Sequence, residues 1–264
     1  MRTESITTRA GEGLSLNRVE EQLRHTLENW QCWCVSLTKK PVVVEELLAG
    51  KTNRSFLVET TSGQVVVRIN AKNSRNLGID RQREAEILLR LQTMGCVPKT
   101  LFISEQVLVS EYISGRCWEA GDLENKDNLK KVSNLLDRIQ DISLPEKFSR
   151  RNYVEYCQNY IQQLPVADQQ SERAFIEKLN RAAIAIDQAG WKPVINHHDL
   201  VPENIIEAEN GVFLLDWEYA AYGHPAIDFI RLYEEQHTSS LIEELLILQQ
   251  GIDKLWGLVS CRLN

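Results

Sequence analysis

The segment from Ile195 to Glu218 constrains the fold of this chain more than any other stretch. Within it, Asn210-Gly211 lies between two short apolar runs, which is the strongest short-range signal for a β-hairpin. Such a hairpin places Asn204, at the start of its first strand, beside Asp216, at the end of its second. We therefore predict that polar side chains from distant positions meet at one end of a small ribbon.

Asp199 precedes this hairpin by only a few residues, so a second carboxylate is expected at the same end. Carboxylate and amide oxygens are the hard ligands that suit Mg²⁺. A carboxylate that holds no metal could accept a proton from an attacking hydroxyl. Phosphoryl transfer requires both parts, a metal that neutralises phosphate charge and a group that orients the nucleophile.

The spacing Asp199-x4-Asn204, followed by an apolar strand and Asp216, resembles the catalytic loop and metal-binding Asp of the protein-kinase fold. With His197 and the run from Asp216 to Ala220, the chain is more similar still to the aminoglycoside phosphotransferase and choline kinase family. Thiamine kinases and bacterial choline kinases are the most similar members. The resemblance implies that Asp199 is the catalytic base, that Asn204 and Asp216 hold Mg²⁺, and that ATP is the phosphate donor.

Two other interpretations of this segment remain open. In the first, His197, His198 and Asp199 are polar residues at a strand end, and Asp216 merely caps a hairpin. In the second, the two histidines and Asp199 bind the metal of a hydrolase. Adjacent residues on an extended segment point to opposite faces, which disfavours a shared metal.

The N-terminal half predicts a meander of β-strands at 42–44, 56–58 and 65–69. Its first turn contains Gly50 and Asn53. In a kinase-like fold this turn lies over the nucleotide phosphates and offers them backbone N–H groups. The sequence lacks the full glycine-rich motif of protein kinases, so a simple hairpin turn is the alternative. Choline kinases, which also carry a glycine and a nearby Asn here, favour phosphate binding.

A second nucleotide-binding feature involves Arg68, in the third strand, and Glu84, on a helix at 80–91 capped by Asp80. In the kinase fold a strand cation pairs with a helix Glu and positions the phosphates. Arg68 and Glu84 match these places by order and spacing. A surface salt bridge is the alternative, and Glu86 is the alternative partner.

Two further strands, at 101–103 and 107–109, complete a five-stranded sheet with one main helix. The residues that follow correspond to the linker that binds adenine through its backbone in kinase-like folds. By position alone, we assign Glu111 to Ile113 to this role. The predicted division is an N-terminal nucleotide-binding lobe, 1–112, and a C-terminal catalytic and substrate-binding lobe, 113–264.

The rest of the chain predicts mainly helices, because apolar residues recur at helical spacing. The predicted helices are 15–31, after a frayed 1–14, then 123–142, 153–164, 175–189, 241–249 and 252–259. The fold class is therefore α+β, a two-lobed protein-kinase-like fold with an antiparallel sheet in the N-terminal lobe and a larger, mainly helical C-terminal lobe.

Charge and composition limit the partners of this 264-residue chain. A net charge of −7 argues against nucleic acid as a partner and is compatible with a cationic substrate. The N-terminus lacks the apolar core of a signal peptide, and no run is long enough to span a membrane. We expect a cytoplasmic protein with no membrane partner and no disulfides. The sequence leaves the oligomeric state open.

The phosphate acceptor is predicted to be a small cationic alcohol of the thiamine or choline/ethanolamine type. Aromatic faces and a carboxylate bind such cations well. Trp217, Glu218, Tyr219 and Tyr222 supply these groups directly after the hairpin, although aromatic residues at such positions also form cores. The alternatives are an aminoglycoside phosphotransferase and a catalytically idle kinase-like protein that binds nucleotide.

Two polar residues follow this segment. Asp228 matches an Asp that supports the active-site loop in the family, so we predict a structural role for it. His224 lies next to Gly223 and Pro225, which predict a turn before a helix. We therefore expect His224 to have a surface or capping role and not to act as a base.

Overall fold

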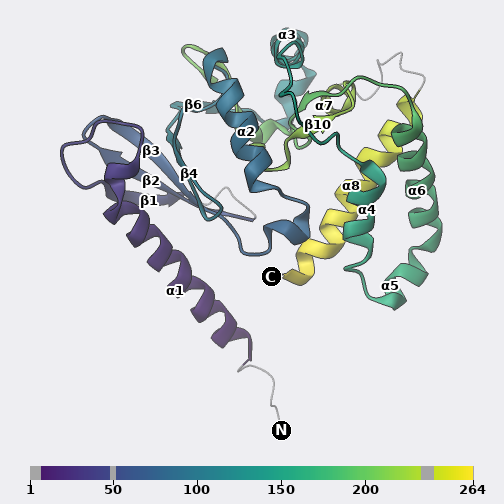
Figure 1. The fold of residues 1–264 in the computed structure, drawn as a ribbon, viewed down its shortest axis with the longest axis horizontal. Coiled ribbons are helices and arrows are strands. Elements are labelled where there is room, and N and C mark those ends of the chain that lie inside the picture. Colours follow the sequence, from purple (N-terminus) through teal and green to yellow (C-terminus); the bar gives the residue numbers. More distant parts are fainter. Residues whose placement is uncertain (1–6, 48–51, 233–240, 264) are drawn as a thin grey trace. The chain divides into compact units, whose positions relative to one another are not determined.

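The computed structural model describes residues 7–47, 52–232 and 241–263 of the chain (Figure 1). The chain forms two compact units. We call residues 1–72 and 98–113 the sheet unit, and residues 73–97 and 114–264 the helical unit.

The sheet unit contains an antiparallel five-stranded sheet in the order β1-β2-β3-β5-β4 (Figure 1). Its strands are β1 (Val42–Leu47), β2 (Arg54–Thr60), β3 (Gly63–Ile69), β4 (Thr100–Ile103) and β5 (Val107–Glu111). Val58, Val67 and Val109 are fully buried on one face. This confirms the predicted meander and the two strands that complete the sheet.

Helix α1 (Thr7–Glu28) packs its last turns against this sheet, where Leu27 joins Val58 and Val67 in one apolar cluster. The helix begins eight residues before the predicted start at Ser15, so the prediction of a frayed 1–14 is wrong from Thr7 onward. Helix extension adds one hydrogen bond for each residue ordered. Once the last turns of α1 pack against the sheet, the helix can extend toward its N-terminus through polar residues that show little apolar periodicity.

Helix α2 (Arg81–Leu91) begins where predicted, because the Asp80 side chain accepts hydrogen bonds from the backbone N–H groups of Gln82 and Arg83. By contacts, however, residues 73–97 belong to the helical unit. The predicted boundary had placed this helix in the N-terminal lobe. The functional division into lobes 1–112 and 113–264 stays a prediction.

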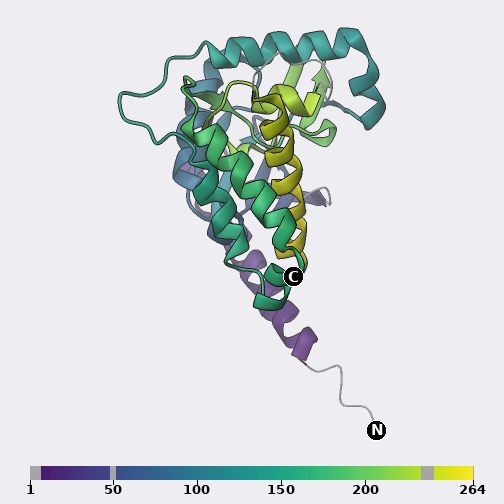
Figure 2. The same cartoon turned by 90° about the vertical axis from the view of Figure 1, so that its right-hand side faces the viewer.

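The helical unit is built mainly from α4 (Tyr153–Ile161), α6 (Arg173–Gln188) and α8 (Ile242–Leu263), which lie side by side in Figure 2. Besides α2, the unit also contains the α-helices α3 (Lys126–Gln140), α5 (Val166–Ser171) and α7 (Ile227–Leu232). Leu179, Ile186 and Leu245 are fully buried between the main helices. The predicted helices at 123–142 and 153–164 are confirmed with shorter ends, and the helix predicted at 175–189 is confirmed as α6, which begins two residues earlier.

Helix α8 is continuous, whereas two helices were predicted with a break near Gly251. A Cβ atom at Gly251 would lie 2.5 Å from a methyl carbon of Leu179 on α6. The glycine therefore allows two helices to approach closely and does not end one.

Two small sheets support the loops of the helical unit. One contains β6 (Gly115–Cys117), β8 (Ile205–Ala208) and β9 (Gly211–Leu214), and the other pairs β7 (Val194–Asn196) with β10 (Ala221–Gly223). The predicted hairpin is confirmed as β8 and β9. Strands β6 and β10 were not predicted, because three residues are too few to show a period of two. Gly223, assigned to a turn, lies in β10, where a Cβ would meet the His198 ring at 2.6 Å.

Within the described residues, no helix has both the length and the apolar character needed to cross a membrane. The six cysteines, all within the described residues, have free thiols.

Candidate active site

The loop that carries Asp199 is held at its start by Asp228, the second residue of α7. The two carboxylate oxygens of Asp228 accept hydrogen bonds from the backbone N–H groups of His197, at 2.7 Å, and His198, at 2.9 Å. His198 has a left-handed backbone with φ of 63°, an uncommon conformation for a non-glycine residue. The chain therefore turns sharply just before Asp199, and the predicted structural role of Asp228 is confirmed.

The imidazole of His197 connects this loop to the end of β9. Its Nε2–H donates to the carbonyl oxygen of Leu215 at 2.6 Å, which leaves Nδ1 to accept from the Asp199 N–H at 3.3 Å. Burial lowers the pKa of His197, so the ring is neutral. His197 therefore acts as a structural link. Because both ring nitrogens of His197 are used in these hydrogen bonds, the hydrolase interpretation, in which His197 binds a metal, is disfavoured.

The hairpin brings Asn204 and Asp216 to the same end of the ribbon, as the sequence predicts. Ile205 pairs with Leu214, and the backbone N–H of Leu215 donates to the Asn204 carbonyl oxygen at 2.8 Å. Asp216 follows immediately and has a left-handed backbone with φ of 56°. An uncommon backbone conformation at a polar residue is typical of functional sites, where surrounding contacts enforce it.

Asn204 also contacts Asp199 directly. Its side-chain Nδ2 donates to the Asp199 carbonyl oxygen at 2.9 Å and lies 3.5 Å from the carboxylate Oδ2. Asp199, Asn204 and Asp216 therefore come from one continuous, hydrogen-bonded structure in the helical unit.

The Asp199 carboxylate is about one-third exposed and lies 3.7 Å from the guanidinium of Arg231 on α7. Burial raises the pKa of this carboxyl above its usual value, and Arg231 opposes that shift. Sequence reasoning missed Arg231, because nothing in the spacing of α7 indicates that one of its side chains reaches back to Asp199.

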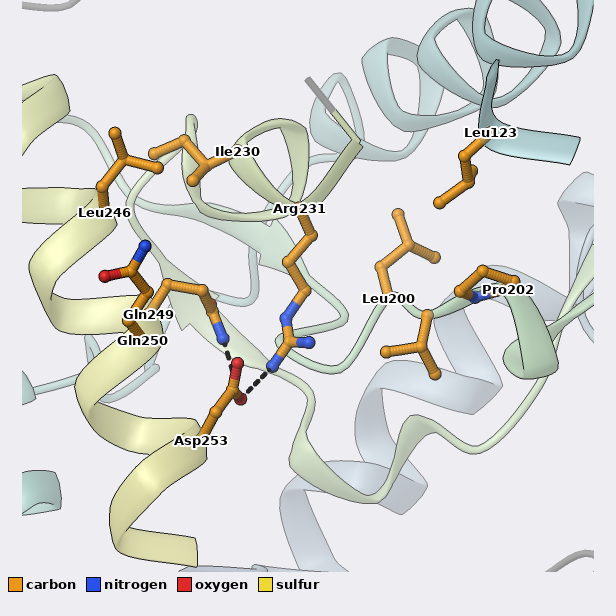
Figure 3. A pocket seen from close by; sticks show the side chains of 10 residues that line it. Leu123, Leu200, Pro202, Ile230, Arg231, Leu246, Gln249, Gln250 and Asp253 are labelled. Atoms are coloured by element: carbon orange, nitrogen blue, oxygen red, sulfur yellow. Dashed lines mark hydrogen bonds and ion pairs between the residues drawn. The ribbon is translucent and has the colours of Figure 1, made fainter. Parts of the chain in front are cut away.

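A cavity of about 170 Å³ lies beside this loop (Figure 3). One side is apolar and includes Leu200 and Pro202, the residues that follow Asp199. The other side carries the polar side chains of Arg231, Gln249 and Asp253 from α7 and α8, together with Ile230 and Leu246. A small molecule in this cavity would therefore contact both an apolar wall and a carboxylate.

The predicted acceptor-binding residues are buried in the helical unit. Trp217, Glu218 and Tyr222 are each 2% exposed, and Tyr219 is 8% exposed. The Trp217 indole N–H donates to the Leu214 carbonyl oxygen, and the Tyr219 hydroxyl accepts from the Trp256 indole. Through these contacts the side chains contribute to the packing of the helical unit. The predicted role of these four residues in acceptor binding stays a prediction.

Glu218 belongs to a buried ion-pair cluster that the sequence did not reveal. The guanidinium of Arg81 donates to Glu84 at 2.8 Å and to Glu218 at 3.0 Å, and none of the three side chains is more than 7% exposed. The spacing of Arg81 and Glu84 on one helix face could have indicated the first pair. Glu218 is 137 residues from Arg81, so no local pattern could have indicated the second.

Two further arginines hold the backbone after Asp216. Arg83 donates to the carbonyl oxygen of Ala220 at 2.8 Å, and Arg151 donates to that of Tyr219 at 2.7 Å. Burial, together with the nearby Arg151, lowers the pKa of Arg83 to about 10. The segment that follows the predicted metal-binding Asp is therefore fixed from several sides.

His224 is buried and has the capping role that was predicted as one of two possibilities. Its Nδ1 accepts from the backbone N–H of Ala226 at 3.1 Å, just before α7. At 6% exposure it is not a surface residue. Burial lowers its pKa to about 4, so it is neutral near pH 7.

The predicted phosphate-binding residues of the sheet unit have structural contacts of their own. Asn53 accepts a hydrogen bond from the Ala71 N–H at 3.2 Å, and Arg68 donates to the Asn70 side chain at 3.0 Å. Gly50 lies outside the described residues. Arg68 and Glu84 belong to different units, so their predicted pairing stays a prediction.

The predicted adenine-binding residues lie at the end of β5. The backbone N–H of Glu111 donates to the Lys99 carbonyl oxygen at 2.9 Å, so the sheet already uses this donor. Ile113 is the last residue of the sheet unit and is half-buried. Nucleotide binding by both residues stays a prediction.

Three comparisons place this fold and site among known proteins. The choline/ethanolamine kinase family model matches residues 44–245. A "Protein LicA homolog" of Mycoplasma capricolum is 25% identical over 207 residues, which cover 76% of this chain and 77% of that protein. The choline kinase LicA from Streptococcus pneumoniae has a crystal structure that is 26% identical, with a TM-score of 0.66 over 84% of this chain and 87% of that one.

A more distant structure, the ADP-bound aminoglycoside phosphotransferase APH(2'')-Ib, shares the fold at 17% identity. Its TM-score is 0.55, over 92% of this chain and 85% of that one. Fold and site together thus define a small-molecule kinase with an α+β, kinase-like fold, as the sequence predicted. The chain belongs to the choline/ethanolamine kinase family.

Proposed function

We propose that this kinase transfers the γ-phosphate of ATP to the hydroxyl of a small cationic alcohol of the choline/ethanolamine type. The convergence of Asp199, Asn204 and Asp216 at one end of the hairpin carries the proposal. A catalytically idle protein that only binds nucleotide is the weaker alternative, because all three groups are present.

In this proposal Asp199 orients the acceptor hydroxyl and accepts its proton. The carboxylate is partly exposed, so a substrate can reach it. The hydrogen bonds from Asn204 and the anchoring of the loop by Asp228 fix its position before substrate arrives. Fixed geometry of this kind lowers the entropic cost of bringing the two reacting groups together.

Asn204 and Asp216 would hold Mg²⁺. Because the Asn204 side chain donates its N–H to Asp199, its amide oxygen is the atom left to face a cation. Together with the Asp216 carboxylate, this gives two hard oxygen ligands, and Mg²⁺ usually takes its remaining ligands from water and substrate phosphates. When bound, the ion would neutralise charge on the phosphate oxygens.

The nucleotide is assigned to the turn with Gly50 and Asn53, to Arg68 with Glu84, and to the segment from Glu111 to Ile113. Support for this comes from the family to which the chain belongs and from the buried position of Arg68 in β3. A guanidinium can bind a phosphate through paired, charge-assisted hydrogen bonds, which is the role that the family implies for Arg68.

The cavity beside Asp199 favours a small acceptor. Its volume of about 170 Å³ is below the roughly 300–1,000 Å³ typical of sites for drug-sized ligands. Choline and ethanolamine are smaller than thiamine and much smaller than an aminoglycoside. Among the lining residues that the structure describes, the carboxylate is Asp253, which is bound to Arg231.

The test is a transfer assay with Mg·ATP and a panel of acceptors: choline, ethanolamine, thiamine, an aminoglycoside and none. Product phosphoester is measured by mass spectrometry beside ADP release. We expect phosphocholine or phosphoethanolamine, and neither product with Mg²⁺ chelated. Phosphorylation of thiamine or the aminoglycoside alone would overturn the acceptor class. Bound ATP without any acceptor-dependent product would favour the idle protein.

A further inference from the structure

The guanidinium of Arg231 lies between two carboxylates in the helical unit, and its distances to them are unequal. Its terminal nitrogen is 2.6 Å from Oδ1 of Asp253 on α8 and 3.7 Å from Oδ1 of Asp199. The first distance is a short charge-assisted hydrogen bond, and the second is beyond hydrogen-bonding range. Arg231 is thus bound to Asp253 and only close to Asp199, as Figure 3 shows for the bound pair.

Asp253 is itself held in place. The side-chain N–H of Gln249, one turn earlier on α8, donates to the same Oδ1 at 3.2 Å. Gln249 is buried, at 7% exposure, whereas the Asp253 side chain is about half exposed. The carboxylate that binds Arg231 is therefore also held by a buried side chain of its own helix.

The position of Arg231 matters for the proposed reaction. A carboxylate offers only acceptor sites, and a guanidinium can occupy two of them through a paired, charge-assisted contact. Such a contact at Asp199 would compete with the acceptor hydroxyl for the same oxygens. A small movement of the guanidinium would bring it within hydrogen-bonding range of Asp199, and its bond to Asp253 opposes that movement.

We propose that Asp253 is a positioning residue that retains Arg231 and so keeps the Asp199 carboxylate available to the acceptor hydroxyl. This inference rests on the proposed function, because it assumes that Asp199 is the base. It predicts that loss of the Asp253 charge harms turnover through Arg231 and not directly.

The experiment compares Asp253→Asn, Arg231→Gln and the double variant in steady-state assays with Mg·ATP and the acceptor found by the panel. We expect Asp253→Asn to lower kcat at least tenfold, with the KM for ATP unchanged. The double variant should recover at least fivefold over Asp253→Asn and reach the level of Arg231→Gln. A purely structural role for Asp253 would not produce this recovery.

Lys254→Gln is the matched control. Lys254 follows Asp253 on α8, and this variant removes its ion pair with Glu172, which lies outside α8. It should leave kcat unchanged, and thermal unfolding should show all variants folded. A double variant no faster than Asp253→Asn would overturn the inference, as would wild-type turnover in Asp253→Asn. A raised KM for the acceptor without recovery would instead make Asp253 a direct ligand.

Asp199→Asn, assayed alongside, separates the two claims. If it retains turnover, the proposed base is wrong and the inference falls with it. If it is inactive while Asp253→Asn is fully active, the proposed function stands and only the role of Asp253 fails.

Discussion

The loop from His197 to Asn204 and the segment from Asp216 to Tyr222 meet at one end of the hairpin, yet they differ in what they present to solvent. In the first, Asp199 is about one-third exposed and lies beside a cavity. In the second, the Trp217, Glu218 and Tyr222 side chains are almost fully buried. The loop offers a functional group, whereas the segment is packed to hold Asp216 in place.

The difference shows that closeness to a catalytic motif in the sequence does not indicate access to substrate. Both segments are fixed by backbone contacts, the loop by Asp228 and the segment by Arg83 and Arg151. Aromatic and acidic residues after Asp216 matched the chemistry of a cation site. These side chains are buried, and Glu218 forms an ion pair with Arg81, so their role in acceptor binding stays a prediction.

The largest stability effect should come from the buried anchor of the second segment. Arg81→Met leaves the Glu84 and Glu218 carboxylates buried without their shared guanidinium, and breaking a buried pair in this way costs about 3–5 kcal/mol. Urea unfolding would measure it. Arg173→Met removes an exposed pair with Glu177 and should leave the free energy of unfolding almost unchanged. Equal losses in the two variants would contradict the importance of the buried cluster.

A smaller loss is expected at the anchor of the loop. Asp228→Asn retains one acceptor oxygen for two backbone donors, so it should lose about 1.5–3 kcal/mol of the free energy of unfolding. It should also lower kcat, because Asp199 lies just beyond those donors. Chemical denaturation and steady-state kinetics measure the two effects.

Asp187→Asn is the matched control for this change. Asp187 likewise accepts from two backbone N–H groups, those of Tyr153 and Val154, but it does so at the start of α4. Its stability loss should be similar, with turnover per folded molecule much less affected. Equal kinetic losses in both variants would mean that Asp228 has no special relation to the loop.

The smallest effect is expected for a hydroxyl in the second segment. Tyr219→Phe removes the acceptor of the Trp256 indole N–H and should cost about 1 kcal/mol of stability. If Tyr219 is a packing residue, as its burial indicates, the KM for the acceptor should change by less than about twofold. A KM raised severalfold would restore its predicted role in acceptor binding.

Local patterns in the sequence predicted much of the fold. The Asn-Gly signal and its flanking apolar runs predicted the β8–β9 hairpin, and Asp80 predicted the start of α2 through its capping chemistry. Strand β10 escaped prediction because it has three residues, and its Gly223 was interpreted as a turn. The break predicted in α8 was wrong because Gly251 serves contact with Leu179.

For the candidate site as well, local patterns in the sequence predicted some features and missed others. The convergence of Asp199, Asn204 and Asp216 follows from hairpin geometry, so spacing alone indicated it. Arg81 with Glu218 and Arg231 with Asp199 depend on how helices pack against loops. Such contacts join residues that are far apart in the chain, and no short-range pattern records them.

The central claim is that Asp199 acts as the base of phosphoryl transfer in the hairpin site. The most direct measurement is acceptor-dependent ADP release by Asp199→Asn, with Mg·ATP binding measured by calorimetry on the same sample. We expect kcat to fall by about 10²–10⁴-fold, the usual contribution of a general base, with Mg·ATP affinity largely retained. Turnover near that of the wild type would contradict it.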